Sequence, residues 1–120
     1  MGKSISAVVL IALFICLWSV GTFGFINNIS EDFIFRIENA EKSTKADEIK
    51  KIYDDWDKEK KKLMYIMNHR DVEEVSTALL RGYHESTSGR YDMAKKEIAL
   101  AKFLLKELVE REKFSLQNLL

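Results

Sequence analysis

The chain has 120 residues, of which 47% are hydrophobic and 32% are charged, and its 19 basic and 19 acidic side chains balance at neutral pH. The two kinds of residue are segregated, because Lys3 is the only charged side chain among the first 30 residues. About 90 residues remain, enough for one small domain with a thin hydrophobic core. Their balanced charge gives no electrostatic reason to bind nucleic acid, so we expect no nucleic-acid partner.

The first predicted element is an uncharged run of 22 residues from Ile5 to Ile26. A helix of that length covers about 33 Å, which matches a hydrocarbon core of about 30 Å. The run therefore predicts a transmembrane helix that contacts the lipid bilayer through residues 5–26. We divide the chain into an amino-terminal transmembrane signal anchor, residues 1–27, and a helical bundle domain, residues 28–120.

The apolar run fits either an uncleaved signal anchor or a signal peptide that is cut after a small-x-small triplet. Residues 19–21 (Ser-Val-Gly) and 22–24 (Thr-Phe-Gly) are such triplets. The apolar stretch continues through Phe25 and Ile26 past both of them, so it is longer than an export signal needs. This length favours the anchor.

The charges on the two sides of the run predict its orientation. Lys3 lies on the amino-terminal side, whereas Glu31 and Asp32, with Arg36 as the nearest basic residue, lie on the other. Positive charge next to a membrane helix is retained in the cytoplasm. We therefore expect a single-pass protein of the cell membrane with a cytoplasmic amino terminus and an extracytoplasmic carboxy-terminal domain.

Helical patterns follow the anchor. Ser30, followed by acidic residues, predicts a helix start, and this helix should end near Lys42. Thr44, with Asp47 three residues on, predicts the start of a second, long helix over residues 45–68. Its apolar residues recur at spacings of three, four and seven and predict an inward face: Ile49, Ile52, Tyr53, Trp56, Leu63 and Met67.

Two more helices are predicted in the second half of the chain. Asp71 and the acids after it predict a third helix start, with Val72, Val75, Leu79 and Tyr83 inward, and residues 86–89 predict a loop. The fourth helix has a seam at spacings of three and four: Tyr91, Ala94, Ile98, Ala101, Leu105 and Leu108. Residues 114–120 are expected to add a short terminal turn that folds back on the bundle.

Short connections make successive helices antiparallel. The expected fold is therefore all-α: an amino-terminal transmembrane helix followed by an antiparallel bundle of three to four helices, arranged as stacked helical hairpins. Residues 89–101 also look like the second half of a tetratricopeptide repeat. From that half-repeat we take helix geometry only, and no peptide-binding function.

The order of features also supports a family resemblance. After the apolar anchor come Trp56 in a charged helix, residues 69–74 at a helix start, Tyr83, the 94–105 helix ending in Lys-Phe-Leu-Leu, and the closing residues 114–120 (Phe-Ser-Leu-Gln-Asn-Leu-Leu). Together they resemble the bacterial family catalogued as domain of unknown function 4363. The resemblance implies a small membrane-anchored helical protein of Gram-positive, clostridia-like bacteria. The family has no established activity, so it supplies no catalytic residues and no cofactor.

The residues themselves point to no catalytic, cofactor or metal site. His69 and the acids in residues 71–74 cluster in sequence, but a helix of about 15 residues would separate His69 from His84 by about 22 Å. Cys16 is the only cysteine and lies inside the apolar run, which excludes a cysteine-based metal site. No phosphate-binding loop and no hydrolase or metalloprotease motif is present.

Two hypotheses remain for the function. Leu100, Phe103 and Leu104 fall off the seam of the fourth helix and widen its apolar face, which favours a central position or contact with a partner. The first hypothesis is a non-enzymatic, membrane-tethered extracytoplasmic module, which either has a structural role or binds another protein or a second copy of itself through these three residues. The alternative is a secreted or envelope enzyme, or a metal-dependent protein, that uses His69 and the neighbouring acids.

Overall fold

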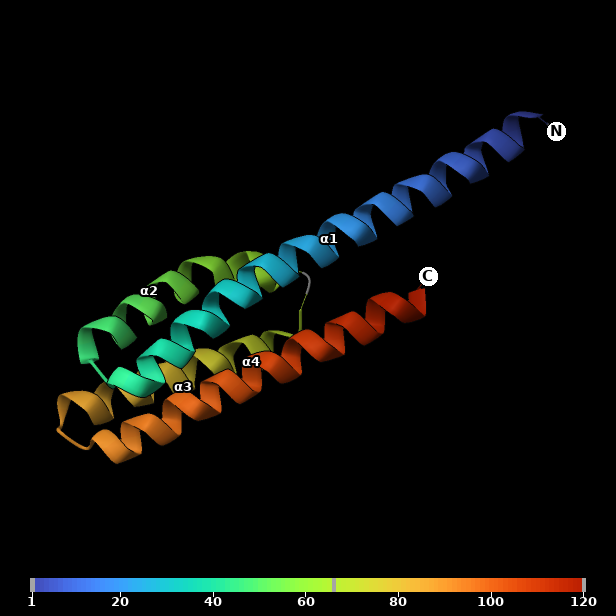
Figure 1. Ribbon diagram of the computed structural model, residues 1–120. Helices are drawn as coiled ribbons and strands as arrows, with labels where there is room; N and C mark the ends of the chain where they lie inside the picture. The colour runs from blue at the N-terminus through green and yellow to red at the C-terminus, as the bar shows by residue number, and fades with distance from the viewer. Residues whose placement is uncertain (1, 66, 120) are drawn as a thin grey trace.

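The computed structural model describes the backbone of residues 2–65 and 67–119, and the side chains in these ranges except those of residues 2–5, 23, 115–117 and 119. Its elements are four helices: α1 (Gly2–Ser43), α2 (Ala46–Leu63), α3 (His69–Thr87) and α4 (Tyr91–Leu119). The molecule measures 70 × 22 × 22 Å because α1 continues far beyond the other three helices (Figure 1). The predicted all-α fold is confirmed.

The second half of α1 forms an antiparallel four-helix bundle with α2, α3 and α4. Helix α4 packs against α1 and α3, and α2 packs against the same two helices from the opposite side. The connections, residues 44–45, 64–68 and 88–90, are short, so each helix returns alongside the one before it (Figure 1).

Helix α1 is unbroken, which contradicts the prediction of a separate helix start at Ser30. Ser30 is buried on the face of α1 that points into the bundle, between Ile26 and Phe33, and does not cap a helix. The chain contains no proline, and Gly21 and Gly24 lie in open surroundings, so no residue here removes a helical hydrogen bond. The apolar segment and the bundle are therefore joined by rigid helix and not by a linker.

The ends of α2 and α3 also differ from the predicted ones. Thr44 does not cap α2, because it turns the chain with φ 51° and its hydroxyl donates to the Ser43 carbonyl. Helix α2 ends at Leu63 instead of residue 68. Helix α3 begins two residues before Asp71, because the Asn68 side chain accepts a hydrogen bond from the Arg70 backbone N–H at 2.9 Å.

The core contains most of the residues predicted to face inward. Trp56 is fully buried and meets Phe33 edge to face, with ring centroids 5.2 Å apart. Tyr53 and Tyr83 are half-buried at its edge. Tyr91 is 58% exposed, so its predicted inward position is wrong; it is the first residue of α4 and lies beyond the last core layer.

The seam of α4 is confirmed from Ala94 onward, since the predicted seam residues after Tyr91 are all buried: Ala94, Ile98, Ala101, Leu105 and Leu108. Gly82 lets α3 pack closely against α4, because a Cβ atom at this position would lie 2.6 Å from the Cδ1 atom of Ile98 in α4. The predicted terminal turn is wrong: α4 continues without a break to Leu119 and does not fold back on the bundle (Figure 1).

Candidate functional site

The three predicted contact residues lie on α4, but only two of them line a groove. Leu100, 41% exposed, and the half-buried Leu104 line a shallow groove against α3, together with Ala78 and the polar residues Glu74, Thr77 and Arg81. Phe103 is not among the residues that line this groove, and it is 58% exposed. Whether a partner binds these residues stays a prediction.

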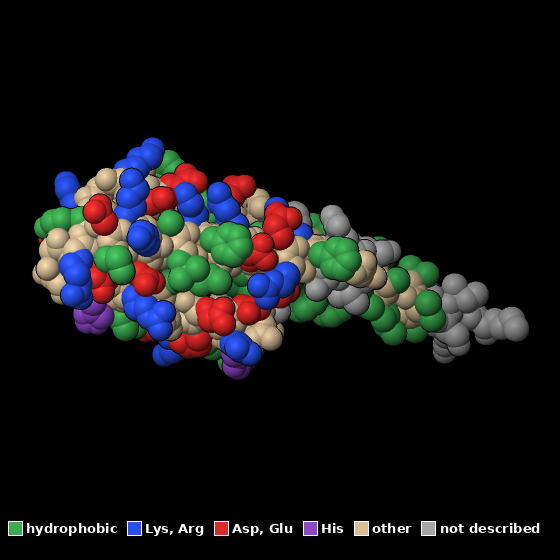
Figure 2. Space-filling model, turned by 90° about the horizontal axis from the view of Figure 1, so that it is seen from below, with side chains coloured by type: hydrophobic (Ala, Val, Ile, Leu, Met, Phe, Trp, Pro, Cys, Tyr) green, Lys and Arg blue, Asp and Glu red, His purple; other side chains and the backbone are tan. Residues whose placement is uncertain are grey.

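Two more exposed apolar residues extend the pattern along the same side of α4. Met93 lies seven residues before Leu100, and Phe114 lies eleven after Phe103, spacings that keep helical residues on one side. We call Met93, Leu100, Phe103 and Phe114 the α4 stripe. In Figure 2 hydrophobic side chains stand singly among charged ones on the face seen from below, so this surface is mixed and not an extended apolar patch.

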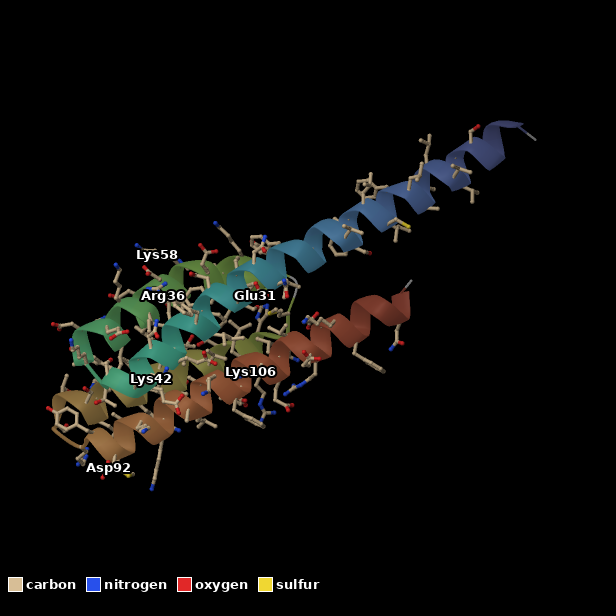
Figure 3. All side chains as sticks on the ribbon, viewed as in Figure 1. Glu31, Arg36, Lys42, Lys58, Asp92 and Lys106 are labelled. Carbon is tan, nitrogen blue, oxygen red and sulfur yellow. The ribbon has the colours of Figure 1, made fainter. Side chains whose placement is uncertain are left out.

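Two lysine side chains of α4 form ion pairs with another helix of the bundle. Lys102 Nζ lies 2.7 Å from Glu41 Oε2, and Lys106 Nζ lies 3.8 Å from Glu38 Oε1. Both pairs join α4 to α1, and they mark the antiparallel register of the two helices. The position of Lys106 on α4 is labelled in Figure 3.

His69 lies at the carbonyl end of α2. Its Nε2 atom is 3.1 Å from the backbone oxygen of Met64, and its neighbour Asp71 pairs with Arg111 at 2.9 Å. Within residues 2–65 and 67–119, no three histidine, cysteine, aspartate or glutamate side chains come together in a group that could hold a metal ion. Of the acids after His69, Asp71 thus joins α3 to α4, whereas Glu74 pairs with Arg70 of its own helix.

Lys60 is the most enclosed of the charged side chains between α2 and α3. Its Nζ atom lies 2.9 Å from Asp57 Oδ1 and 3.2 Å from Glu73 Oε1, and only 17% of the side chain is exposed. The hydrogen bond that Lys60 donates to Asp57 raises the pKa of Lys60, and the same bond lowers the pKa of Asp57. Each partner is held in its charged form, which suits an ion pair and not proton transfer.

The pKa of Glu112 is shifted in the direction that favours its neutral form. Burial raises the pKa of Glu112 above its usual value of 4.5, and the negative charge of Asp71 adds to the effect. It lies near the carboxy-terminal end of α4, directly before Lys113, the last charged residue of the helix.

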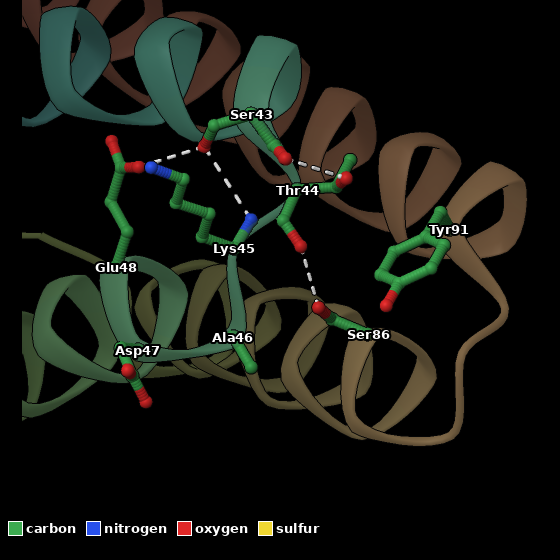
Figure 4. Close-up of a pocket in the computed structure, with 8 residues that line it drawn as sticks. All are labelled: Ser43, Thr44, Lys45, Ala46, Asp47, Glu48, Ser86 and Tyr91. Carbon is green, nitrogen blue, oxygen red and sulfur yellow. Dashed lines mark hydrogen bonds between the residues drawn. The ribbon is translucent and has the colours of Figure 1, made fainter.

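A hollow at the end of the bundle far from the apolar segment is lined by groups that hydrogen-bond to one another (Figure 4). The Ser43 hydroxyl bonds to Glu48 Oε2 at 2.7 Å, and the Ser86 hydroxyl donates to the Thr44 carbonyl at 2.6 Å. The second bond joins the α1–α2 turn to the end of α3. These groups stabilise two neighbouring turns, so we assign this hollow a structural role.

A second hollow lies where the apolar segment enters the bundle. It is lined by four residues of α1 and two from the end of α2 and the connection after it: Trp18, Gly21, Thr22, Phe25, Lys62 and Tyr65. Tyr65 is 93% exposed. The sequence reasoning missed Tyr65, although an aromatic residue in the uncharged stretch 63–68 was a visible signal.

The model of the family described as domain of unknown function (DUF4363) matches residues 25–119. The chain belongs to this family. The matched part covers the whole bundle and begins at the end of the apolar segment, which confirms the resemblance drawn from the sequence. No curated protein and no solved structure matches the chain.

Proposed function

We propose that this DUF4363 protein is a single-pass membrane protein whose bundle lies outside the cytoplasm and binds another protein through the α4 stripe. The membrane anchor is supported by one observation, the exposure of the α1 side chains that precede the bundle. Residues 6–43 form a helix long and apolar enough to cross a membrane, and the large apolar side chains from Val8 to Leu17 are exposed. Burying each such side chain is worth about 1.5–3 kcal/mol, and a bilayer supplies that burial.

The unbroken course of α1 supports a tether in place of a cleaved leader. The segment that would be removed by cleavage at residues 21 or 24 continues without interruption into the bundle helix. Thr22 and Ile26, which flank the second cleavage site, are buried against the rest of the protein. A peptidase needs extended chain at its cut site, so this packing favours retention of the segment.

Anchoring is tested with Val9→Arg/Phe14→Arg in the full chain. Each arginine in the bilayer centre costs about 2.5–3.5 kcal/mol, so this variant should move to the soluble fraction after alkaline extraction. The matched control is Phe35→Arg/Tyr91→Arg, which changes two exposed aromatic residues of the bundle and should stay with the membrane. A mature protein beginning at Thr22 or Phe25 contradicts the anchor.

Orientation is tested with protease added to intact, wall-stripped cells. The bundle should be degraded while the apolar segment is spared, because the bundle lies on the outer side in the proposed topology. Full protection of the bundle under conditions that degrade a surface-exposed control protein would place it in the cytoplasm.

The partner surface is tested by cross-linking in native membranes. Phe103→Glu should abolish a cross-linked product, whereas Phe35→Glu, a change of an equally exposed phenylalanine on α1, should leave it intact. Equal cross-linking by all three proteins, or none by the natural sequence, contradicts a contact at the α4 stripe. The competing metal-dependent hypothesis predicts a metal-induced rise in thermal stability that is lost in His69→Ala.

A further inference from the structure

The two ends of the bundle differ in charge. At the far end, the connections and helix termini contain Lys45, Asp47, Glu48, Arg90 and Asp92. At the end nearer the apolar segment, the charges stop at Lys62 of α2 and resume at Arg70 of α3, and the sequence has no charged side chain in residues 4–30, 63–68 or 114–120. Parts of these three segments lie at the end of the bundle nearer the apolar segment, and we call those parts the uncharged base. Both ends consist of helix termini and short connections, so the difference does not follow from the fold.

The charge boundaries of α1, α3 and α4 fall at one level. Glu41 pairs with Lys102 and Glu38 with Lys106, and the same antiparallel register brings Glu31, the first charge of α1 in the bundle, to the level of Lys113, the last charge of α4. Figure 3 labels Glu31 where α1 enters the bundle.

Two further pairs extend this level to the other helices. The pair of Asp71 with Arg111 brings the start of α3 to the level of Lys113. The pair of Arg36 with Asp55 places Lys62, the last charge of α2, within about one helical turn, or 5 Å, of the same level. In all four helices, therefore, the charged residue nearest the base lies close to a common plane.

Packing also continues past this plane along the apolar segment. The buried stripe of α1 extends from Ala40 through Ile26 to Thr22 and Ser19, and Ser19 is only 2% exposed. Residues 5–18 alone would span about 21 Å, too short for a hydrocarbon core of about 30 Å. If α1 crosses the membrane, the residues packed beside positions 19–26 must lie at the same depth as those positions.

From this geometry we infer that the uncharged base sits in the lipid headgroup–acyl boundary of the bilayer that α1 crosses. The carboxy-terminal end of α4 and the α2–α3 connection would then contact lipid beside α1. The inference rests on the proposed function, since it needs α1 to be a membrane anchor. The occupant that fits is a phospholipid bilayer, because the base offers apolar and aromatic side chains with uncharged polar ones.

The hollow between α1 and the α2–α3 connection has the composition of a membrane interface. Trp18, Phe25 and Tyr65 surround it, and Lys62 lies on the charged side with two-thirds of its side chain exposed. Tryptophan and tyrosine concentrate at the headgroup level, and a lysine there extends its ammonium group toward the phosphates. The antiparallel register brings the end of α4 to about the level of Phe25, one residue from the end of the apolar run.

The inference is tested with nitroxide labels on the full chain in vesicles of phosphatidylcholine with one quarter phosphatidylglycerol. Collisions with oxygen, which concentrates in lipid, are compared with collisions with a water-soluble nickel chelate. In a Cys16→Ser background, single cysteines replace Tyr65 and Phe114 of the base. The matched controls are Tyr91→Cys at the far end and Phe103→Cys, which lies on the same helix and in the same stripe as Phe114.

Labels at positions 65 and 114 should collide several-fold more with oxygen, relative to the nickel chelate, than labels at 91 and 103. Equal ratios at all four positions would overturn the inference. All four residues are exposed, so the replacements remove little packing, and exposed Asn118 offers a second position on α4 if Phe114→Cys loses helicity. A label on Cys16 of the natural sequence reports on the anchor separately. If it is in lipid and the base is in water, only the inference fails; if it is in water, the proposed anchor fails as well.

Discussion

Trp56 provides a test of how the core is stabilised. Its side chain is fully buried, yet its Nε1 atom has no hydrogen-bond partner among the described residues. A buried N–H without a partner costs about 1–3 kcal/mol, because the group has given up its bond to water. The same side chain supplies a large apolar contact to Phe33. Trp56 therefore combines a stabilising ring with a destabilising polar group.

These two contributions predict different outcomes for two substitutions. Trp56→Ala should lower the free energy of unfolding by about 3–5 kcal/mol, through the lost burial and the cavity that remains. Trp56→Phe loses about two carbon groups of burial, about 1.5 kcal/mol, but also removes the unpaired N–H. The two effects of Trp56→Phe nearly cancel, so its free energy of unfolding should lie within about 1 kcal/mol of that of the natural sequence.

The measurement is urea unfolding of the full chain in detergent micelles, followed by far-ultraviolet circular dichroism. Trp18→Phe is the control, because Trp18 lies outside the buried core and its replacement should leave the free energy of unfolding unchanged. A loss above about 2.5 kcal/mol in Trp56→Phe would refute the reasoning, since the N–H would then have to be contributing a bond.

Further predictions concern charge and close packing. The pKa of Glu112 is raised in the folded state, so the folded protein holds this proton more tightly than the unfolded chain does. The resulting stabilisation is present below about pH 4.5 and is lost as the pH rises. Glu112→Gln should therefore raise the melting temperature at pH 7 and have little effect below pH 4. Lys60→Gln should cost about 1 kcal/mol in urea unfolding by releasing Glu73, whereas the exposed Lys62→Gln should cost nothing measurable; equal effects would contradict a role of the enclosed pair. Gly82→Val should cost about 1–3 kcal/mol by forcing α3 and α4 apart, and an unchanged melting temperature would show that the interface has room.

Part of the structure could be read from the sequence because helical periodicity is local. Ala94, Ile98 and Ala101 recur at the spacing that brings side chains to one face, and that face is buried whatever its partner is. The apolar run and its length were visible for the same reason. The errors lie at helix ends: Ser30 has the residue type of a cap, but capping depends on whether the chain leaves the helix, and tertiary packing keeps it helical there.

The candidate sites show where local patterns stop being sufficient. The sequence indicated that Leu100, Phe103 and Leu104 lie off the seam, but only packing against α3 separates two of them into a groove and leaves the third exposed. Likewise, the sequence alone determined that three separate segments carry no charge. That these segments meet at one end of the bundle depends on the register of antiparallel helices, which is fixed by contacts between residues as far apart as Glu41 and Lys102. Such contacts leave no periodic trace in the chain, so only the tertiary structure decided the position of the uncharged base.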